Sequence, residues 1–210
     1  MIPARPRWRY SYNALVRRIR PAVAAVLALA MIGFGLVLIL FRNSGSFLVV
    51  DNRERSDAIV ITQADSLDMG YWMGLHLLAE GYGRELFLDA RTDRMFFGRS
   101  QAASLSGRVN VCPITAETTA QEGYEVGNCL RGRLVRSVLL VVDDFHCRRS
   151  LAIFSHLLPR YRWSIAAVPD GERFGRPWWQ KRVWIRTAVV EWQHMLWWEF
   201  VDRWRFDPSR

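Results

Sequence analysis

One uninterrupted apolar run constrains this chain more than any other feature of its sequence. It extends from Pro21 to Phe41 and reads PAVAAVLALAMIGFGLVLILF, 21 residues without a charged side chain. As a helix that rises about 1.5 Å per residue, the run spans roughly 30 Å, the thickness of the hydrocarbon core of a bilayer. The apolar part of a cleaved signal peptide is shorter, about 7–15 residues, and a core helix normally carries a polar stripe. We therefore predict an uncleaved transmembrane helix at Pro21–Phe41.

Arginines on the two sides of this run predict its orientation. Residues 1–20 contain six arginines, and no acidic residue precedes Asp51. The fifteen residues that follow the run contain three, Arg42, Arg53 and Arg55. Because the flank richer in basic residues stays in the cytoplasm, we expect a cytoplasmic N-terminus and an extracytoplasmic segment from residue 42 to residue 210. In a bacterium this describes a single-pass protein of the inner membrane with a periplasmic domain.

The net charge of +9 and the pI near 10.3 make nucleic acid the first partner to consider, because clustered basic residues neutralise phosphates. The arginines of residues 1–20, however, account for six of these charges. Residues 42–210 carry 23 basic residues against 20 acidic ones. The excess therefore indicates a membrane orientation, and we expect no nucleic-acid partner.

Short apolar stretches alternate with segments of helical length after the anchor. Their continuous apolarity is typical of strands buried on both faces of a parallel sheet. A repeat of this kind predicts an α/β fold, with a Rossmann-like, doubly wound, mostly parallel sheet. The expected strands are Ala58–Thr62, Glu85–Asp89, Val109–Cys112, Ser137–Asp143 and Trp163–Val168, and the expected helices are Leu67–Glu80, Arg94–Ser104, Thr119–Arg131 and Phe145–Leu158.

Four parts follow from this organisation. They are an Arg-rich cytoplasmic tail at residues 1–20, the transmembrane helix at 21–41, a linker at 42–54, and a Rossmann-like domain at 55–210 with a Trp-rich C-terminal helix. The sequence shows no internal repeat, no low-complexity tract and no second domain.

The ligand of a doubly wound sheet binds beyond the carboxyl ends of its strands. Here that rule selects Thr62–Asp65, Asp89–Arg94, Pro113–Thr119, Asp143–Arg149 and Asp170–Arg173. The first expected strand continues into Thr62-Gln63-Ala64-Asp65 rather than a glycine-rich phosphate loop, so we do not expect a classical dinucleotide site.

The third expected helix opens with Glu117-Thr118-Thr119-Ala120-Gln121-Glu122. Thr119 and Glu122 have the spacing of a capping box, in which each side chain satisfies a backbone N–H at the helix start. The same hydroxyl and carboxylate can also face the crevice. Both interpretations stay open at this stage.

A second polar stretch, Asp143-Asp144-Phe145-His146-Cys147-Arg148-Arg149, follows the fourth strand. Its cations lie in the first turn of a helix, where the helix dipole favours negative charge. A bound anion would offset them, held by free N–H groups and by Arg149, one turn from His146. The alternative is a salt bridge to Asp143, Asp144 or Glu122. No ligand spacing supports a metal site, and we expect none.

The odd number of cysteines, Cys112, Cys129 and Cys147, cannot pair completely within one chain. One disulfide with one buried free thiol and three inert core cysteines are both consistent with the sequence. Neither a zinc ribbon nor a thioredoxin-type site is expected, because the chain has no C-x-x-C.

Seven of the ten tryptophans lie between Trp178 and Trp204, interleaved with basic residues. Apolar residues from Val183 to Trp204 cover most directions of a helical wheel, and Glu191, His194 and Glu199 exclude a second membrane span. We expect a terminal helix packed on the sheet. The alternative is that Trp and Arg side chains dock the domain on the outer face of the membrane.

An ordered set of motifs resembles the SanA/YdcF/ElyC type of bacterial domain of unknown function. The motifs are Ser56-Asp57-Ala58-Ile59-Val60, Thr119-x-Gln121-Glu122, the apolar strand Ser137–Val142, and Phe145-His146-x-x-Arg149-Ser150-Leu151-Ala152-Ile153-Phe154. The resemblance covers about Arg55 to Trp204, and the short anchor before one domain is similar to the SanA-like arrangement. It implies a membrane-anchored Rossmann-like domain, associated with envelope integrity, that binds a nucleotide-like or phosphate-bearing ligand. No settled reaction comes with it, and the cofactor is left open.

The family usually ends its first two strands in Leu-Gly-Gly and Ser-Gly-Gly, where this chain has Thr62-Gln63-Ala64 and Asp89-Ala90-Arg91. It also places an arginine early in the first helix, where this chain has Asp68, Met69 and Gly70. Glycines allow a backbone to approach a phosphate closely, so the resemblance implies a divergent member with a changed or lost activity.

From the residues and the resemblance together, we expect the domain to bind an anionic nucleotide-like or lipid-phosphate metabolite, with hydrolysis or transfer left open. The expected catalytic residues are His146, as acid/base or phosphate partner, and Glu122. The expected ligand-binding residues are Arg149, Thr119, Asp143, Asp57 and Thr62. The alternative is a non-enzymatic envelope or membrane interaction protein with a degenerate site filled by its own salt bridges.

Overall fold

The computed structural model describes residues 8–62, 67–89, 107–169, 174 and 177–206. It divides the chain into two compact units, residues 1–43 and 44–210, which we describe separately. The expected helix Arg94–Ser104 and the rim segments 90–94 and 170–173 lie outside the described residues.

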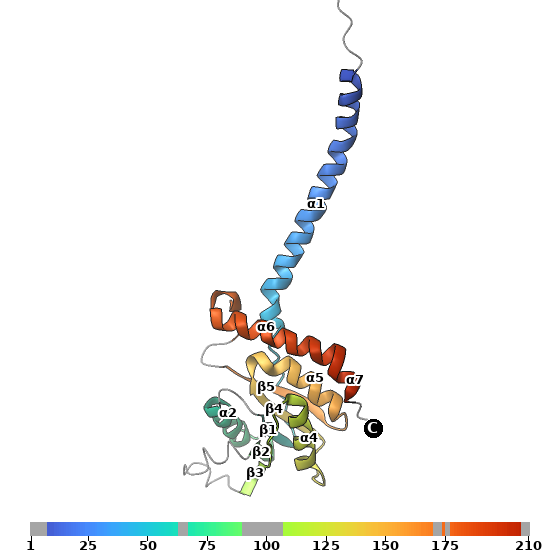
Figure 1. Cartoon of the computed structure of the whole chain (residues 1–210). Helices are drawn as coiled ribbons and strands as arrows, with labels where there is room; N and C mark the ends of the chain where they lie inside the picture. The colour runs from blue at the N-terminus through green and yellow to red at the C-terminus, as the bar shows by residue number, and fades with distance from the viewer. Residues whose placement is uncertain (1–7, 63–66, 90–106, 170–173, 175–176, 207–210) are drawn as a thin grey trace, which may run out of the picture. The chain divides into compact units, whose positions relative to one another are not determined.

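The first unit contains most of helix α1, Trp8–Leu48 (Figure 1). Pro21 lies inside this helix, and its apolar side chains from Val23 to Phe41 are exposed. Within the described residues α1 is the one helix long and apolar enough to cross a membrane, at Val23–Leu48. This finding is consistent with the predicted single-pass anchor, although the helix extends beyond Pro21–Phe41 at both ends.

The second unit is built on five parallel strands in the order β3-β2-β1-β4-β5. This is the doubly wound order, so the predicted Rossmann-like α/β fold is confirmed. The strands are β1 (Ala58–Ile61), β2 (Glu85–Asp89), β3 (Val109–Cys112), β4 (Ser137–Asp143) and β5 (Arg162–Val168), each within one residue of its predicted bounds.

Successive side chains of the central strands point to opposite faces of the sheet, and this divides the core into two layers. Leu139 and Val141 of β4 face a cluster that includes helix α2 (Leu67–Ala79). Leu140 and Val142 face the other cluster, which includes helices α4 (Thr119–Leu130) and α5 (Cys147–Leu157). Figure 1 shows α2 on one side of the sheet and α4 and α5 on the other. Burial on both faces explains why these strands read as unbroken apolar runs.

Most of the predicted linker at residues 42–54 belongs to the second unit, which begins at Ser44. Its first half completes α1, and Leu48 is buried beside Trp178 and Ala188. Further on, Asn52 accepts a hydrogen bond from the backbone N–H of Ile165 with its side-chain oxygen, at 2.9 Å. The chain therefore enters the domain within a few residues of the apolar run.

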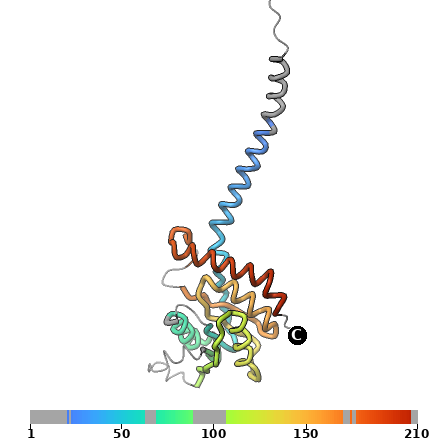
Figure 2. Tube along the Cα trace, viewed as in Figure 1, coloured from blue at the N-terminus to red at the C-terminus, as the bar shows by residue number. Residues whose placement is uncertain are grey.

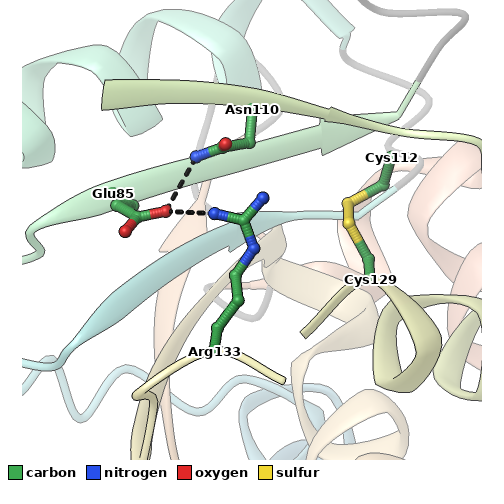
Figure 3. The surroundings of a disulfide bond; sticks show 5 residues. All are labelled: Glu85, Asn110, Cys112, Cys129 and Arg133. Atoms are coloured by element: carbon green, nitrogen blue, oxygen red, sulfur yellow. Dashed lines mark hydrogen bonds and ion pairs between the residues drawn. A yellow bond between two sulfur atoms is a disulfide. The ribbon is translucent and has the colours of Figure 1, made fainter. Parts of the chain in front are cut away.

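A disulfide joins Cys112, at the end of β3, to Cys129 on α4 (Figure 3). Close by, Glu85 accepts hydrogen bonds from Asn110 and from Arg133, at 2.9 and 2.7 Å. Cys147 is a buried free thiol, and burial raises its pKa to about 12. Of the two arrangements that the cysteine count allows, the structure has one disulfide with one buried thiol.

The C-terminal segment consists of α6 (Arg182–Trp197), a π-helical turn η4 (Trp198–Asp202) and the short α7 (Arg203–Arg205). It packs on α5 and on the 3₁₀ turn η2 (Asp144–His146), beside a second 3₁₀ turn, η3 (Trp178–Gln180), as Figure 2 also shows for α5 and α6. The expectation of a packed terminal helix is therefore correct, but its main support is α5 and η2 rather than the sheet.

Candidate functional site

A buried carboxylate on the C-terminal helix organises the carboxyl end of the sheet. Glu191 is 2% exposed. Its Oε2 accepts a hydrogen bond from Arg149 Nε at 2.9 Å, and its Oε1 accepts one from Arg149 Nη2 at 3.2 Å. The same Oε1 lies 2.9 Å from His146 Nδ1. Two oxygens of one carboxylate therefore hold two of the three basic residues that the sequence places at the start of α5, His146 and Arg149.

The helices bring these groups together by simple periodicity. His146 and Arg149 lie one turn apart where the chain passes from η2 into α5, so their side chains share a face. Glu191 belongs to the inward stripe of α6, between Ala188 and Met195. Intervals of three and four residues keep this stripe on one side of the helix. Glu191 therefore occupies a core position in an apolar helix.

Opposing influences act on the pKa of Glu191. Burial raises it, whereas the hydrogen bonds and charges of His146 and Arg149 lower it and win, so the pKa lies below its ordinary value of 4.5. Glu191 is therefore ionised at neutral pH. The ion pair lies in the geometry that makes Arg–carboxylate pairs strong, with two N–H groups on two oxygens.

The contacts of His146 indicate its tautomer. Nδ1 lies 2.9 Å from both Glu191 Oε1 and Arg149 Nη2. Because a guanidinium only donates and an ionised carboxylate only accepts, the buried charge of Glu191 is best satisfied when Nδ1 carries the proton. We assign the neutral ring this tautomer, which leaves Nε2 as the nitrogen with a free lone pair. A histidine oriented by a carboxylate in this way is suited to acid/base chemistry.

Thr119 is not the residue that caps α4. The N-cap is Thr118, whose hydroxyl accepts a hydrogen bond from Gln121 N, so the capping interpretation of Thr119 and Glu122 is wrong by one residue. This shift leaves the Thr119 hydroxyl to accept a hydrogen bond from Arg149 Nη1 at 2.7 Å. The alternative that Thr119 faces the crevice is therefore the correct one.

A hollow of about 520 Å³ adjoins this network. One wall is the start of α4, another is Arg149 and Ile153 of α5, and the third is the C-terminal segment. The lining residues are Glu117, Thr118, Thr119, Ala120, Gln121, Arg149, Ile153, His194, Trp197, Trp198, Asp202 and Phe206. The walls thus offer backbone N–H groups, one guanidinium, two carboxylates and three aromatic rings to a single space.

Three other predicted site residues, Thr62, Asp143 and Glu122, lie near the carboxyl end of the sheet or on α4 but outside this network. Thr62 and Asp143 lie at the carboxyl ends of β1 and β4 as expected, and both are buried. The Thr62 hydroxyl donates a hydrogen bond to the carbonyl of Val141 at 3.3 Å. Glu122 is buried on α4 and is not among the residues that line the described hollow. Of the predicted site residues, Thr119, His146 and Arg149 form one connected network of contacts.

Asp57 lies at the opposite end of the sheet, before β1. Its Oδ2 accepts hydrogen bonds from the N–H groups of Arg136 and Ser137 and from the Ser137 hydroxyl, and these contacts lower its pKa against the effect of burial. The hollow beside it, about 710 Å³, is lined by five arginines, Arg55, Arg84, Arg108, Arg136 and Arg162. The prediction that Asp57 contributes to the site of Arg149 is therefore wrong, because the carboxylate joins the start of β1 to that of β4.

The alternative interpretation of these cations, an internal salt bridge, named the wrong acids. Arg149 and His146 pair with Glu191 rather than with Asp143, Asp144 or Glu122. Arg148 donates from Nε to the carbonyl of Phe47 and its guanidinium stacks over the Phe47 ring, at 3.8 Å from the centroid. A signal for Glu191 exists in the sequence, because a lone acid at core spacing in a Trp-rich helix requires a buried cation.

Among the described residues, no group of three or more His, Cys, Asp or Glu side chains is arranged to hold a metal ion. Comparison with known proteins found no family model, curated protein or solved structure that matches this chain. The resemblance to the SanA/YdcF/ElyC type of domain therefore stays a prediction.

Glu191 predicts a pH dependence of stability. A carboxyl group whose pKa is lowered by folding stabilises the fold above its unfolded pKa and loses that contribution as the pH falls through its folded pKa. We expect Glu191→Gln to cost about 3 to 5 kcal/mol at pH 7. Between pH 5 and pH 3 its free energy of unfolding, measured with urea, should fall less steeply than that of the unmodified protein.

The matched control is Glu199→Gln, on the same segment, which removes a more exposed pair with Arg203. It should change stability by less than about 1 kcal/mol and leave the acid slope unchanged. Equal acid slopes for Glu191→Gln and the unmodified protein would contradict an ionised, buried Glu191.

Proposed function

We propose that this chain is a single-pass protein of the bacterial inner membrane whose periplasmic Rossmann-like domain binds an anionic, phosphate-bearing metabolite. The ligand is nucleotide-like or the phosphate of a lipid headgroup, and binding contributes to the integrity of the envelope. The single observation that carries this proposal is the hollow of about 520 Å³ that borders Arg149, Thr119 and the first turn of α4.

The first turn of α4 supports the anionic part of the ligand. The α4 helix has twelve residues, and Thr118, Thr119 and Ala120 at its start all line the hollow. The first N–H groups of a helix have no partner within the helix and bind phosphate or carboxylate oxygens well. Arg149 adds a guanidinium whose planar fork matches a phosphate.

The C-terminal segment supports the remainder of the ligand. Trp197, Trp198 and Phe206 line the same hollow, and their rings suit the flat or apolar part of a nucleotide-like molecule. Trp198 is buried, and among the described residues its indole N–H has no hydrogen-bond partner. A buried donor of this kind is satisfied when a ligand oxygen reaches it.

Glu191 makes the site selective. Its carboxylate already occupies two N–H groups of Arg149, so a ligand gains from Arg149 only if it competes with an internal anion. Glu117 and Asp202 also line the hollow, and their negative charges likewise oppose the binding of a weak anion. We expect a ligand with two or more negative charges, held by its phosphate at α4. His146 is not among the residues that line this hollow, and it contributes through its contacts with Glu191 and Arg149.

A second candidate function is favoured by the same ion pair. If Glu191 keeps Arg149 permanently, the domain is a non-enzymatic envelope or membrane interaction protein with a filled site. The ligand-binding domain and the filled site differ in their response to Glu191→Gln, which removes the negative charge beside Arg149. Only a ligand-binding site then gains affinity for an anion.

Ligand binding is tested by thermal stabilisation of the full-length protein in micelles. The probes are inorganic phosphate, pyrophosphate, a nucleoside monophosphate and glycerol phosphate. At one hundred times the dissociation constant, a ligand that binds only the folded state adds about 2.7 kcal/mol. We expect at least one probe to stabilise the unmodified protein and Glu191→Gln to respond at lower concentration.

The double variant Arg149→Gln/Glu191→Gln removes both charges together and should lose the response. Arg136→Gln, in the hollow at the other end of the sheet, is the matched control and should keep it. No stabilisation of either the unmodified protein or Glu191→Gln by any probe would decide for the filled site. Loss in Arg136→Gln alone would contradict the proposed location.

The proposed localisation rests on the arginine asymmetry around α1 and on the disulfide, because disulfides persist in oxidising compartments. A reporter enzyme that is active only in the periplasm, fused after Arg210, should be active. Moving the six arginines of residues 1–20 to the far side of the apolar run should abolish that activity. An inactive fusion to the unmodified chain would contradict the proposed orientation.

A further inference from the structure

We propose that the outward face of the C-terminal segment lies on the surface of the same membrane that α1 spans, in the headgroup region of the outer leaflet. We call this face the outer stripe. It consists of the exposed apolar side chains Val183, Val189, Val190, Leu196, Phe200 and Trp204. This contact is separate from the anchor and does not depend on any ligand of the domain.

The segment carries two apolar stripes rather than one. The inner stripe contains Trp184, Ala188, Glu191, Met195 and Trp198, which pack in the domain. The outer stripe repeats at similar intervals on the opposite side. A surface helix of a globular domain usually has one apolar stripe and a polar face. The second stripe therefore requires a partner other than this domain.

Exposure is greatest at the two ends of the outer stripe. Val183 is 73% exposed, Phe200 is 75% exposed and Trp204 is 76% exposed. From Val183 to Trp204 the helical segment is roughly 30 Å long at about 1.5 Å per residue. Arg186 and Gln193 are exposed at the same helical intervals, so the apolar side chains form two groups, at 183–190 and at 196–204. Exposed apolar groups of this kind mark a protein or membrane contact in soluble domains.

The charges beside the stripe favour a lipid surface. Lys181, Arg182, Arg186, Arg203 and Arg205 are all exposed. The acids of the segment are committed, because Glu191 is buried, Glu199 pairs with Arg203 at 2.7 Å, and Asp202 lies 3.8 Å from Arg205. Basic residues beside Trp, Phe and Leu are the composition of helices that lie in the interface and attract anionic headgroups.

Chain connectivity holds the segment close to the bilayer. Trp192, near its middle, donates a hydrogen bond from Nε1 to the carbonyl of Ser44 at 3.3 Å and stacks on Phe47 at 5.4 Å between ring centroids. Ser44 follows Phe41, the last residue of the apolar run, by three residues. Three residues reach at most about 10 Å, whatever the angle between the two units.

These observations select the bilayer over a protein partner. Trp192 joins this helix to Ser44, which lies at most about 10 Å of chain beyond the apolar run, so the helix can reach the headgroup region with its outer stripe toward the membrane. Trp and Tyr rings prefer that region, and cationic side chains reach phosphates from it. A second copy of the chain is the other occupant that an apolar stripe allows, and the experiment below separates the two.

The test uses the full-length protein in liposomes that contain phosphatidylglycerol. A single cysteine is introduced by Phe200→Cys or Trp204→Cys and spin-labelled, since the native free thiol Cys147 is buried and the other two cysteines form a disulfide. The control is Leu134→Cys, between α4 and β4, where the side chain is 96% exposed. Collision rates with oxygen and with a water-soluble nickel chelate report depth.

At positions 200 and 204 we expect the oxygen-to-nickel ratio to exceed that at position 134 severalfold, consistent with a depth of about 5–10 Å. Replacing phosphatidylglycerol by phosphatidylcholine, or introducing Arg182→Glu and Arg186→Glu, should lower the ratio. A ratio at both positions equal to that at position 134 would overturn the proposal. Protection from both reagents with spin–spin broadening would also overturn it, because the stripe would then cover a second copy.

Discussion

The ion pair between Glu191 and Arg149 is the interaction on which the packing of α6 at the carboxyl end of the sheet depends. A carboxylate that is 2% exposed is tolerated only when cations and hydrogen bonds replace its water. Arg149 supplies two N–H groups and His146 supplies one more. Because these partners lie at the end of β4, the pair fixes α6 over the carboxyl edge of the sheet. A helix that offered only apolar contacts could slide or rotate on α5, whereas the charge defines one register.

The register of α6 then determines what its neighbouring residues do. With Glu191 inside, Trp192 contacts Ser44 and Phe47 as the chain enters the domain, and Trp197 and Trp198 form a wall of the hollow beside Thr119. The remaining direction of the helix is the outer stripe. One helix thus connects the entry of the chain, the candidate site and the proposed membrane contact.

Much of the fold is predictable from local sequence because each strand is apolar on both faces. Ser137–Asp143 and Glu85–Asp89 match their predicted bounds for this reason. The topology rule that ligands bind at the carboxyl ends of strands correctly brings Thr119, His146 and Arg149 together. Glu191 was missed because it lies 42 residues after Arg149 and its role depends on how a terminal helix docks. Asp57 was misplaced because a motif does not reveal at which end of a strand its carboxylate is used, and the cap at Thr118 was missed by one residue because adjacent threonines are equivalent in sequence.

The central claim, that Glu191 and Arg149 hold α6 in one register, is tested most directly by a double-mutant cycle. Unfolding free energies are measured for the full-length protein, for Glu191→Gln, for Arg149→Gln and for the double variant, with Glu199→Gln and Arg203→Gln as an exposed comparison pair on the same segment. Contacting groups in one network couple by about 0.5 to 3 kcal/mol. We predict a coupling of about 2 kcal/mol or more for Glu191 and Arg149, and less than about 0.5 kcal/mol for the exposed pair. Equal, small couplings for both pairs would contradict the claim.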